Sequence, residues 1–192
     1  ALEYRDSDGD LVHANLSVEL VDSTPPDFTI APVTLTDDGF DNTDAVVGQS
    51  PFLIGHQSDP LLADSLAFAD QAATLTRLNG SVLSSDGHVL SFEFSGDRLL
   101  TGYYQDANGN RVEVLKAELT ASQNGSDIDG KVTVSLNGPL DHQGSDQLSL
   151  GLSISAKEID GDETRADLQI AINDGMDPSL GIDGGISLQE GA

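Results

Sequence analysis

The chain of 192 residues contains no cysteine and no tryptophan, and its aromatic content is 5%. The absence of cysteine excludes disulfide bonds, metal–thiolate sites and a cysteine nucleophile. Positive charge is also scarce, since 8 basic residues face 33 acidic ones and the net charge is −25. Such a chain is repelled by nucleic acids and by anionic membrane surfaces, so cations are its natural partners.

Long apolar segments are missing as well. No stretch approaches the roughly 20 apolar residues that span a bilayer, and no signal-peptide pattern opens the sequence. We therefore expect no membrane insertion.

Catalytic motifs are absent from the sequence. It has no nucleophile elbow, no phosphate loop and no dinucleotide fingerprint, and its four histidines lack metal-ligand spacing. Carboxylate pairs are so abundant that they do not single out an acid/base pair. We therefore expect neither an enzyme nor a small-molecule substrate, and we expect His142 to have a structural hydrogen-bonding role.

Apolar residues alternate with polar ones along most of the chain, which is typical of half-buried strands. The predicted strands cover residues 13–21, 89–94, 99–104, 112–119, 132–136, 148–154 and 166–172. Residues 59–75 are ambiguous and fit a short helix or an irregular crossover. This pattern predicts an all-β fold, namely an immunoglobulin-like antiparallel β-sandwich with an aliphatic core.

Turn-forming dipeptides separate the predicted strands. They are Asp86-Gly87, Gly96-Asp97, Asn108-Gly109, Asp129-Gly130 and Asn137-Gly138. Each predicts a tight connection between neighbouring strands.

The chain also repeats itself. Residues 8–26 align without a gap onto residues 160–178, an offset of 152 residues. The identical positions are Asp8, Gly9, Asp10, Ala14, Leu16, Asp22 and Pro26, which recur as Asp160, Gly161, Asp162, Ala166, Leu168, Asp174 and Pro178. This similarity predicts a tandem-repeat module.

The repetition sets the expected domain boundaries. Residues 1–22 are predicted to close a preceding repeat, and residues 23–32 to form a stiff, proline-containing linker. Residues 33–174 then form one complete sandwich. Residues 175–192 are expected to be a linker and the start of the next repeat.

Several segments together resemble a known family. They are the penultimate strand with its acidic turn (LSLGLSISAKEIDGD, residues 148–162), the Asp-x-x-x-Pro junction at 174–178, Gly-Pro-Leu-Asp-His at 138–142 and Leu-Leu-Thr-Gly at 99–102. In this order they resemble the type I secretion target repeat of large bacterial RTX adhesins. The glycine-rich nonapeptides of that family are absent here.

The resemblance implies a calcium-dependent extender, repeated in tandem, in an adhesin that is exported by type I secretion to the cell surface and acts in adhesion and biofilm formation. Its partners would be neighbouring repeats of the same chain, and the fragment itself is expected to be monomeric. A calcium-dependent lectin-like or peptide-binding module is the alternative. Tyr103 and Tyr104 are the only adjacent aromatic pair that could support sugar stacking.

Calcium ligands are predicted from the acids. Aspartate accounts for 25 of the 33 acidic residues, and clusters of Asp, Asn and Gly between strands can supply several hard oxygen ligands. A salt-tolerant acidic surface is compatible with this prediction but would be expected to use Glu more freely. The predicted ligands of several Ca²⁺ ions are Asp6, Asp8, Asp10, Asp22, Asp27, Asp37, Asp38, Asp41, Asp44, Asp106, Asn108, Asn110, Asp127, Asp129, Glu158, Asp160, Asp162, Asp174 and Asp177.

Three of these groups have simpler interpretations. Residues 106–110 equally fit an Asn-Gly hairpin turn, and the run from Asp37 to Asp44 fits a solvated loop. The acids around the prolines of the two junctions fit ordinary linker charge. If calcium does bridge the junctions, it would fix the angle between repeats.

Overall fold

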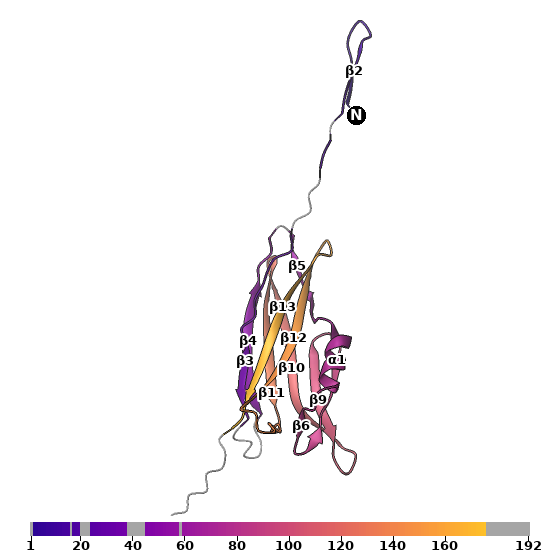
Figure 1. The fold of residues 1–192 in the computed structure, drawn as a ribbon. Coiled ribbons are helices and arrows are strands. Elements are labelled where there is room, and N and C mark those ends of the chain that lie inside the picture. The colour runs from indigo at the N-terminus through magenta and orange to yellow at the C-terminus, as the bar shows by residue number, and fades with distance from the viewer. Residues whose placement is uncertain (1, 16, 20–23, 38–44, 58, 176–192) are drawn as a thin grey trace, which may run out of the picture.

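The computed structural model describes residues 2–15, 17–19, 24–37, 45–57 and 59–175. Two sheets pack face to face (Figure 1). The first has the order β4-β11-β10-β9-β8 and the second β3-β13-β12-β5. The predicted all-β sandwich is therefore confirmed.

The strands of the five-stranded sheet are β4 (Val46–Ile54), β8 (Ser91–Ser95), β9 (Leu99–Gln105), β10 (Arg111–Asn124) and β11 (Asp127–Leu136). The four-stranded sheet contains β3 (Val33–Thr36), β5 (Leu61–Phe68), β12 (Gln147–Glu158) and β13 (Glu163–Asn173). A short ladder joins β6 (Ser84–Ser85) to β7 (His88–Val89).

Aliphatic side chains fill the space between the sheets, as predicted. The strands present alternate residues to this core, as in β11, where every second residue from Ile128 to Leu136 is buried. The fully buried large side chains are Ile54, Leu61, Leu66, Leu100, Leu115, Ile128, Leu136, Leu150, Ile154, Leu168, Ile170 and Ile172. At about 25 cal/mol per Å² of apolar surface, their burial is the main stabilising contribution.

One strand pair differs from the antiparallel prediction. β3 pairs with β13 in parallel, in the register Val33↔Ile170 to Thr36↔Asn173. Neither β3 nor β4 was predicted as a strand. β3 is only four residues long, and β4 contains Gly48 and Pro51. Pro51 is tolerated because β4 lies at the edge of its sheet.

Residues 59–75 contain a strand and the start of a helix. β5 ends at Phe68, and α1 (Gln71–Asn79) follows. The helix is fixed to β8 by Asn79, whose amide donates to Phe92 O at 3.1 Å and accepts from Phe92 N at 2.6 Å. Arg77 of the same helix donates to the carbonyl of Gly151 in β12. The helix thus links an edge strand of one sheet to a central strand of the other.

The predicted turn at Asp129-Gly130 is wrong, because both residues lie inside β11. The β10–β11 hairpin instead turns after Asn124, where Gly125 has φ 63°. Gly130 is required for packing. A Cβ at this position would lie 2.2 Å from a ring carbon of Phe52, which is directly opposite on β4.

The predicted linker at residues 23–32 is partly built into the sandwich. Phe28 and Ile30 belong to the core, and the ring of Phe28 lies 5.8 Å from that of Phe52. The Thr164 hydroxyl donates to the carbonyl of Pro26. The chain therefore joins the body of the sandwich from Pro26 onward.

The remaining strands form a separate hairpin at the N-terminal end of the chain (Figure 1). β1 (Leu2–Arg5) pairs with β2 (Leu11–Ala14). The predicted strand 13–21 starts within β2 but extends beyond its end at Ala14. Residues 15 and 17–19 are not in a strand.

This hairpin matches the outer part of the β12–β13 hairpin in register. Leu2↔Ala14 corresponds to Ile154↔Ala166, and Arg5↔Leu11 corresponds to Lys157↔Glu163. Every pair is displaced by the same 152 residues that relate the two sequences. The sequence similarity is therefore accompanied by the same strand pairing.

Candidate functional site

The β12–β13 turn brings three carboxylates together at the upper end of the sandwich, as oriented in Figure 1. Glu158, Asp160 and Asp162 each place an oxygen within 4.8 Å of the others. The turn closes through Glu158 N to Asp162 O at 2.8 Å and Gly161 N to Glu158 O at 3.1 Å. Gly161 has φ 108°, a conformation that disfavours other residues.

Glu158 differs from its two neighbours in burial. Its side chain is 1% exposed, whereas Asp160 is exposed and Asp162 is half-buried. Strand β5 borders this position through the register pair Glu158↔Leu61. A carboxylate at this depth loses hydration, so a nearby cation would favour its ionised form.

The β1–β2 turn repeats this geometry. Asp6, Asp8 and Asp10 also place oxygens within 4.8 Å of one another, and all three are exposed. The same two backbone bonds occur, Asp6 N to Asp10 O at 3.0 Å and Gly9 N to Asp6 O at 3.3 Å. Both sequence-predicted groups are thus assembled by the same type of turn.

Residues 106–110 form a third turn of this type and connect β9 to β10. The bonds are Asp106 N to Asn110 O and Gly109 N to Asp106 O, both at 2.9 Å. Asp106 accepts from the side-chain amide of Asn110 at 3.0 Å and from the backbone N–H groups of Asn108 and Asn110 at 2.8 Å. The Asn110 amide in particular lowers the pKa of Asp106. The geometry is that of the Asn-Gly hairpin, with only one carboxylate.

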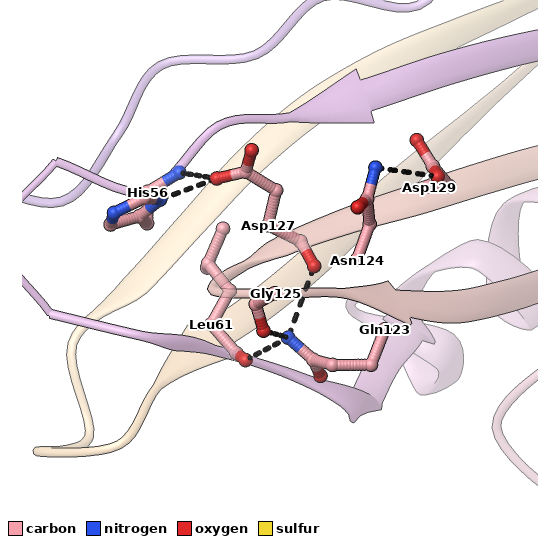
Figure 2. A network of polar contacts seen from close by, with 7 residues as sticks. All are labelled: His56, Leu61, Gln123, Asn124, Gly125, Asp127 and Asp129. Carbon is pink, nitrogen blue, oxygen red and sulfur yellow. Dashed lines mark hydrogen bonds and ion pairs between the residues drawn. The ribbon is translucent and has the colours of Figure 1, made fainter.

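Asp127 and Asp129 lie on β11 and have protein partners (Figure 2). Asp127 Oδ1 lies 2.5 Å from His56 Nδ1 and accepts from His56 N at 2.9 Å, contacts that lower the pKa of Asp127. Asp129 accepts from the amide of Asn124 at 3.1 Å. These interactions give both carboxylates a structural role at the β10–β11 turn.

Gln123 organises the same region and was not predicted. Its amide nitrogen donates to the carbonyls of Leu61, Gly125 and Asp127 at 2.9–3.1 Å (Figure 2). Its amide oxygen accepts from Ala63 N at 2.9 Å. One glutamine thus ties the hairpin of one sheet to β5 of the other. A single polar residue near a strand end gives no sequence signal for such a role.

The lower end of the sandwich holds a different group. His142 Nε2 lies 3.0 Å from Asp37 Oδ2, and both side chains are buried. Asp174 completes a set of ligand atoms within 4.8 Å of one another. The predicted hydrogen-bonding role of His142 is confirmed. Its association with two of the predicted ligand aspartates was not predicted.

The other predicted junction acids are less informative. Asp27 is exposed on the segment that enters the sandwich. Five further predicted ligands lie outside the described residues: Asp22, Asp38, Asp41, Asp44 and Asp177.

One face of each of the two adjacent tyrosines is covered by another side chain. The guanidinium of Arg111 lies 3.7 Å from the ring centroid of Tyr103. His88 stacks on Tyr104 with a centroid separation of 4.6 Å. Sugar stacking on these two faces would have to displace Arg111 and His88, which counts against the lectin-like alternative.

No protein-family model matches the chain, and no curated protein sequence matches it. Within the described part of the chain, no helix is long and apolar enough to cross a membrane.

Proposed function

We propose that this chain is a calcium-stabilised structural module that is repeated in tandem. In this proposal it extends an RTX-type adhesin, exported by type I secretion, away from the cell surface. The observation that carries the proposal is the pair of matching hairpins, each of which ends in a turn with three carboxylates.

The matching register supports tandem repetition. Two hairpins 152 residues apart share four strand pairs, both turn-closing hydrogen bonds and a glycine with φ above 100°. β12–β13 is completed by β3 and β5. By analogy, β1–β2 is the closing hairpin of another sandwich.

The carboxylate spacing supports calcium. Two oxygens bound to one Ca²⁺ at about 2.3–2.6 Å lie at most about 5.2 Å apart. The oxygens in both turns meet this limit, at 4.8 Å or less. Three carboxylates in one short turn also match the preference of calcium for several hard oxygen ligands. Backbone carbonyls and water would supply the rest.

The two calcium candidates differ in expected affinity. In the turn at 158–162, Glu158 is held in the interior between β13 and β5. The turn at 6–10 is exposed throughout. A carboxylate that is already held in place by burial loses less side-chain entropy on binding an ion than an exposed carboxylate does. We therefore assign the stronger site in this chain to residues 158–162.

A short connector would make such an array stiff. Under the offset of 152 residues, Val21 corresponds to Asn173, the last residue of β13. The sandwich begins at Pro26, so in a tandem array with this offset the connector between repeats would be residues 22–25. Four residues span at most about 14 Å. This short distance is consistent with a structural extender.

Thermal unfolding in EDTA and across a calcium titration tests the proposal, with magnesium at matched ionic strength as the control. At ten times the dissociation constant, one site adds about 1.4 kcal/mol. For a chain of this size this corresponds to roughly 3–6 °C in Tm. Equal stabilisation by magnesium, or none by calcium, would contradict the proposal.

Two matched variants locate the effect. Asp160→Asn should remove most of the calcium-dependent rise in Tm, because it removes an exposed ligand while leaving the turn glycine in place. The control variant Asp86→Asn, in the β6–β7 turn, should retain the calcium-dependent rise in Tm. Asp86 has φ 50°, a conformation that Asn tolerates, so this control preserves the local backbone.

A further inference from the structure

The group at the lower end of the sandwich differs chemically from the acidic turns. His142 follows β11, Asp37 follows β3, and Asp174 follows β13. The side chains of His142 and Asp37 are 3% and 5% exposed. Asp174 is exposed and thus gives the group access to solvent.

Hydrogen bonding orients the imidazole. Nδ1 of His142 lies 3.1 Å from the carbonyl oxygen of Ser145, which can only accept, so Nδ1 carries a proton. In the neutral ring Nε2 then has a lone pair, and it faces Asp37 Oδ2 at 3.0 Å. Two acceptors this close require a positive ion between them, either a proton or a metal.

Charge favours a divalent ion. With a proton on Nε2, one imidazolium faces the two carboxylates of Asp37 and Asp174, which leaves a net charge of −1. A divalent ion bound to neutral His142 and the same carboxylates leaves the group neutral. A divalent ion would thus balance the charge of this group, in which Asp37 and His142 are buried, within a chain whose net charge is −25.

We propose that His142, Asp37 and Asp174 bind a divalent transition-metal ion of the zinc type. Imidazole nitrogen is a good ligand for zinc, whereas calcium takes oxygen ligands. In a tetrahedral zinc site, two ligands at about 2.1 Å from the ion lie about 3.4 Å apart. His142 Nε2 and Asp37 Oδ2, which are 3.0 Å apart, would therefore separate slightly when the ion binds. The exposed Asp174 carboxylate can rotate to complete the set, and water fills the open position.

The surrounding backbone holds the ligands in place. Asp37 Oδ1 accepts from Gly175 N at 2.9 Å, and Oδ2 accepts from Leu140 N at 3.2 Å. The Ser145 carbonyl fixes the histidine tautomer. Such outer hydrogen bonds orient metal ligands in proteins. A bound ion would therefore tie together the ends of β3 and β13 and the β11–β12 loop.

Metal binding by the whole chain tests this inference. Cobalt(II) should give visible absorption bands that zinc abolishes, and zinc affinity follows from competition with a chromophoric chelator. Nitrogen NMR of the histidine rings should show a metal-bound Nε2 on one buried ring. Asp174→Asn should weaken zinc at least about tenfold, the scale seen for lost outer-shell partners. Its Tm without metal should stay unchanged, because the side chain is exposed.

Two controls separate this group from surface binding. His13→Gln removes an exposed histidine of the N-terminal hairpin and should leave zinc affinity unchanged. His142→Gln should abolish the cobalt bands, with circular dichroism as the check on folding. Absence of cobalt bands, unchanged ring signals on adding zinc, or an unchanged affinity in Asp174→Asn would each overturn the proposal.

The inference is independent of calcium. If calcium stabilises the chain but cobalt gives no absorption bands, only the proposed zinc site is refuted. If the chain binds zinc at His142 but calcium does not stabilise it, only the proposed function is refuted.

Discussion

Replacing Gly130 by alanine should destabilise the sandwich because of the ring of Phe52. The new Cβ would lie 2.2 Å from Phe52 Cε2 and 2.3 Å from Cζ. Carbon atoms pack at about 3.5–4.0 Å, so the ring or β11 has to move by more than 1 Å. Phe52 is 8% exposed and packs on Phe28, which anchors the segment that enters the sandwich.

The expected loss of unfolding free energy is about 1–3 kcal/mol, the usual cost of overpacking. For a protein of 150–250 residues this lowers Tm by roughly 2–12 °C. Chemical denaturation followed by circular dichroism measures the free energy directly.

Gly151→Ala is the matched control. This residue also lies inside a strand, β12, but the nearest atom to its added Cβ is an amide nitrogen of Gln169 at 3.4 Å. Removing a strand glycine there should be neutral or stabilising by up to about 1 kcal/mol. In the double variant Phe52→Leu with Gly130→Ala, the penalty of the alanine should shrink. If Gly130→Ala is as stable as Gly151→Ala, or if Phe52→Leu brings no relief, the assigned packing is wrong.

Two further predictions concern side chains that join separate elements. Asn79→Ala should lower the free energy of unfolding, measured with denaturant, by about 2–3 kcal/mol, because it leaves the N–H and C=O groups of Phe92 without their Asn79 partners. Asn79→Asp can still accept from Phe92 N and should lower this free energy less at neutral pH. The pKa of Asp141 is lowered, first by the Ser84 hydroxyl and also by Gly87 N at 2.9 Å. The pKa of Asp141 is lower in the folded state than in the unfolded state. Its ionised carboxylate therefore stabilises the fold at pH values above the ordinary aspartate range, and this stabilisation is lost as the pH falls. The Tm difference between the wild type and Asp141→Asn should therefore vanish in acid, and a difference that grows on acidification would refute the assignment.

Alternation of apolar residues was sufficient to predict the central strands. β11, β12 and β13 bury every second side chain over most of their length, which is the pattern that the sequence displays. β5 was harder because its pairing with β12 shifts register between Ser155 and Lys157. A bulge breaks strict alternation, so the segment fitted a short helix or an irregular crossover rather than a strand.

The turns were predictable where glycine needs positive φ and not where it serves packing. Gly87, Gly96 and Gly109 have φ of 66–81° and lie in the predicted turns. Gly130 follows an aspartate, as Gly87 does, yet it accommodates an aromatic ring from another strand. That contact joins residues 78 positions apart, so the dipeptide alone does not reveal it.

Candidate sites could be predicted where their residues are close together in the sequence, but not where they are far apart in it. The turns at 6–10 and 158–162 were predicted because their carboxylates are close in sequence. The association of Asp37 with His142 depends on residues 105 positions apart. The burial of Glu158 could not be predicted either, because the aligned residue of the other acidic turn, Asp6, is exposed.

The acidity of the chain has two physical interpretations that salt distinguishes. At 0.1 M salt, screening acts over about 10 Å, so it weakens repulsion between carboxylates spread over a surface. Within the turns at 6–10 and 158–162 the oxygens lie within 4.8 Å, closer than this length. Direct coordination relieves repulsion at that range, whereas a diffuse ion atmosphere does so only weakly. If the acids act only as a salt-tolerant surface, raising sodium chloride should reproduce the effect of calcium. If the turns are calcium sites, the rise in Tm with calcium should persist in high sodium chloride and depend on Asp160.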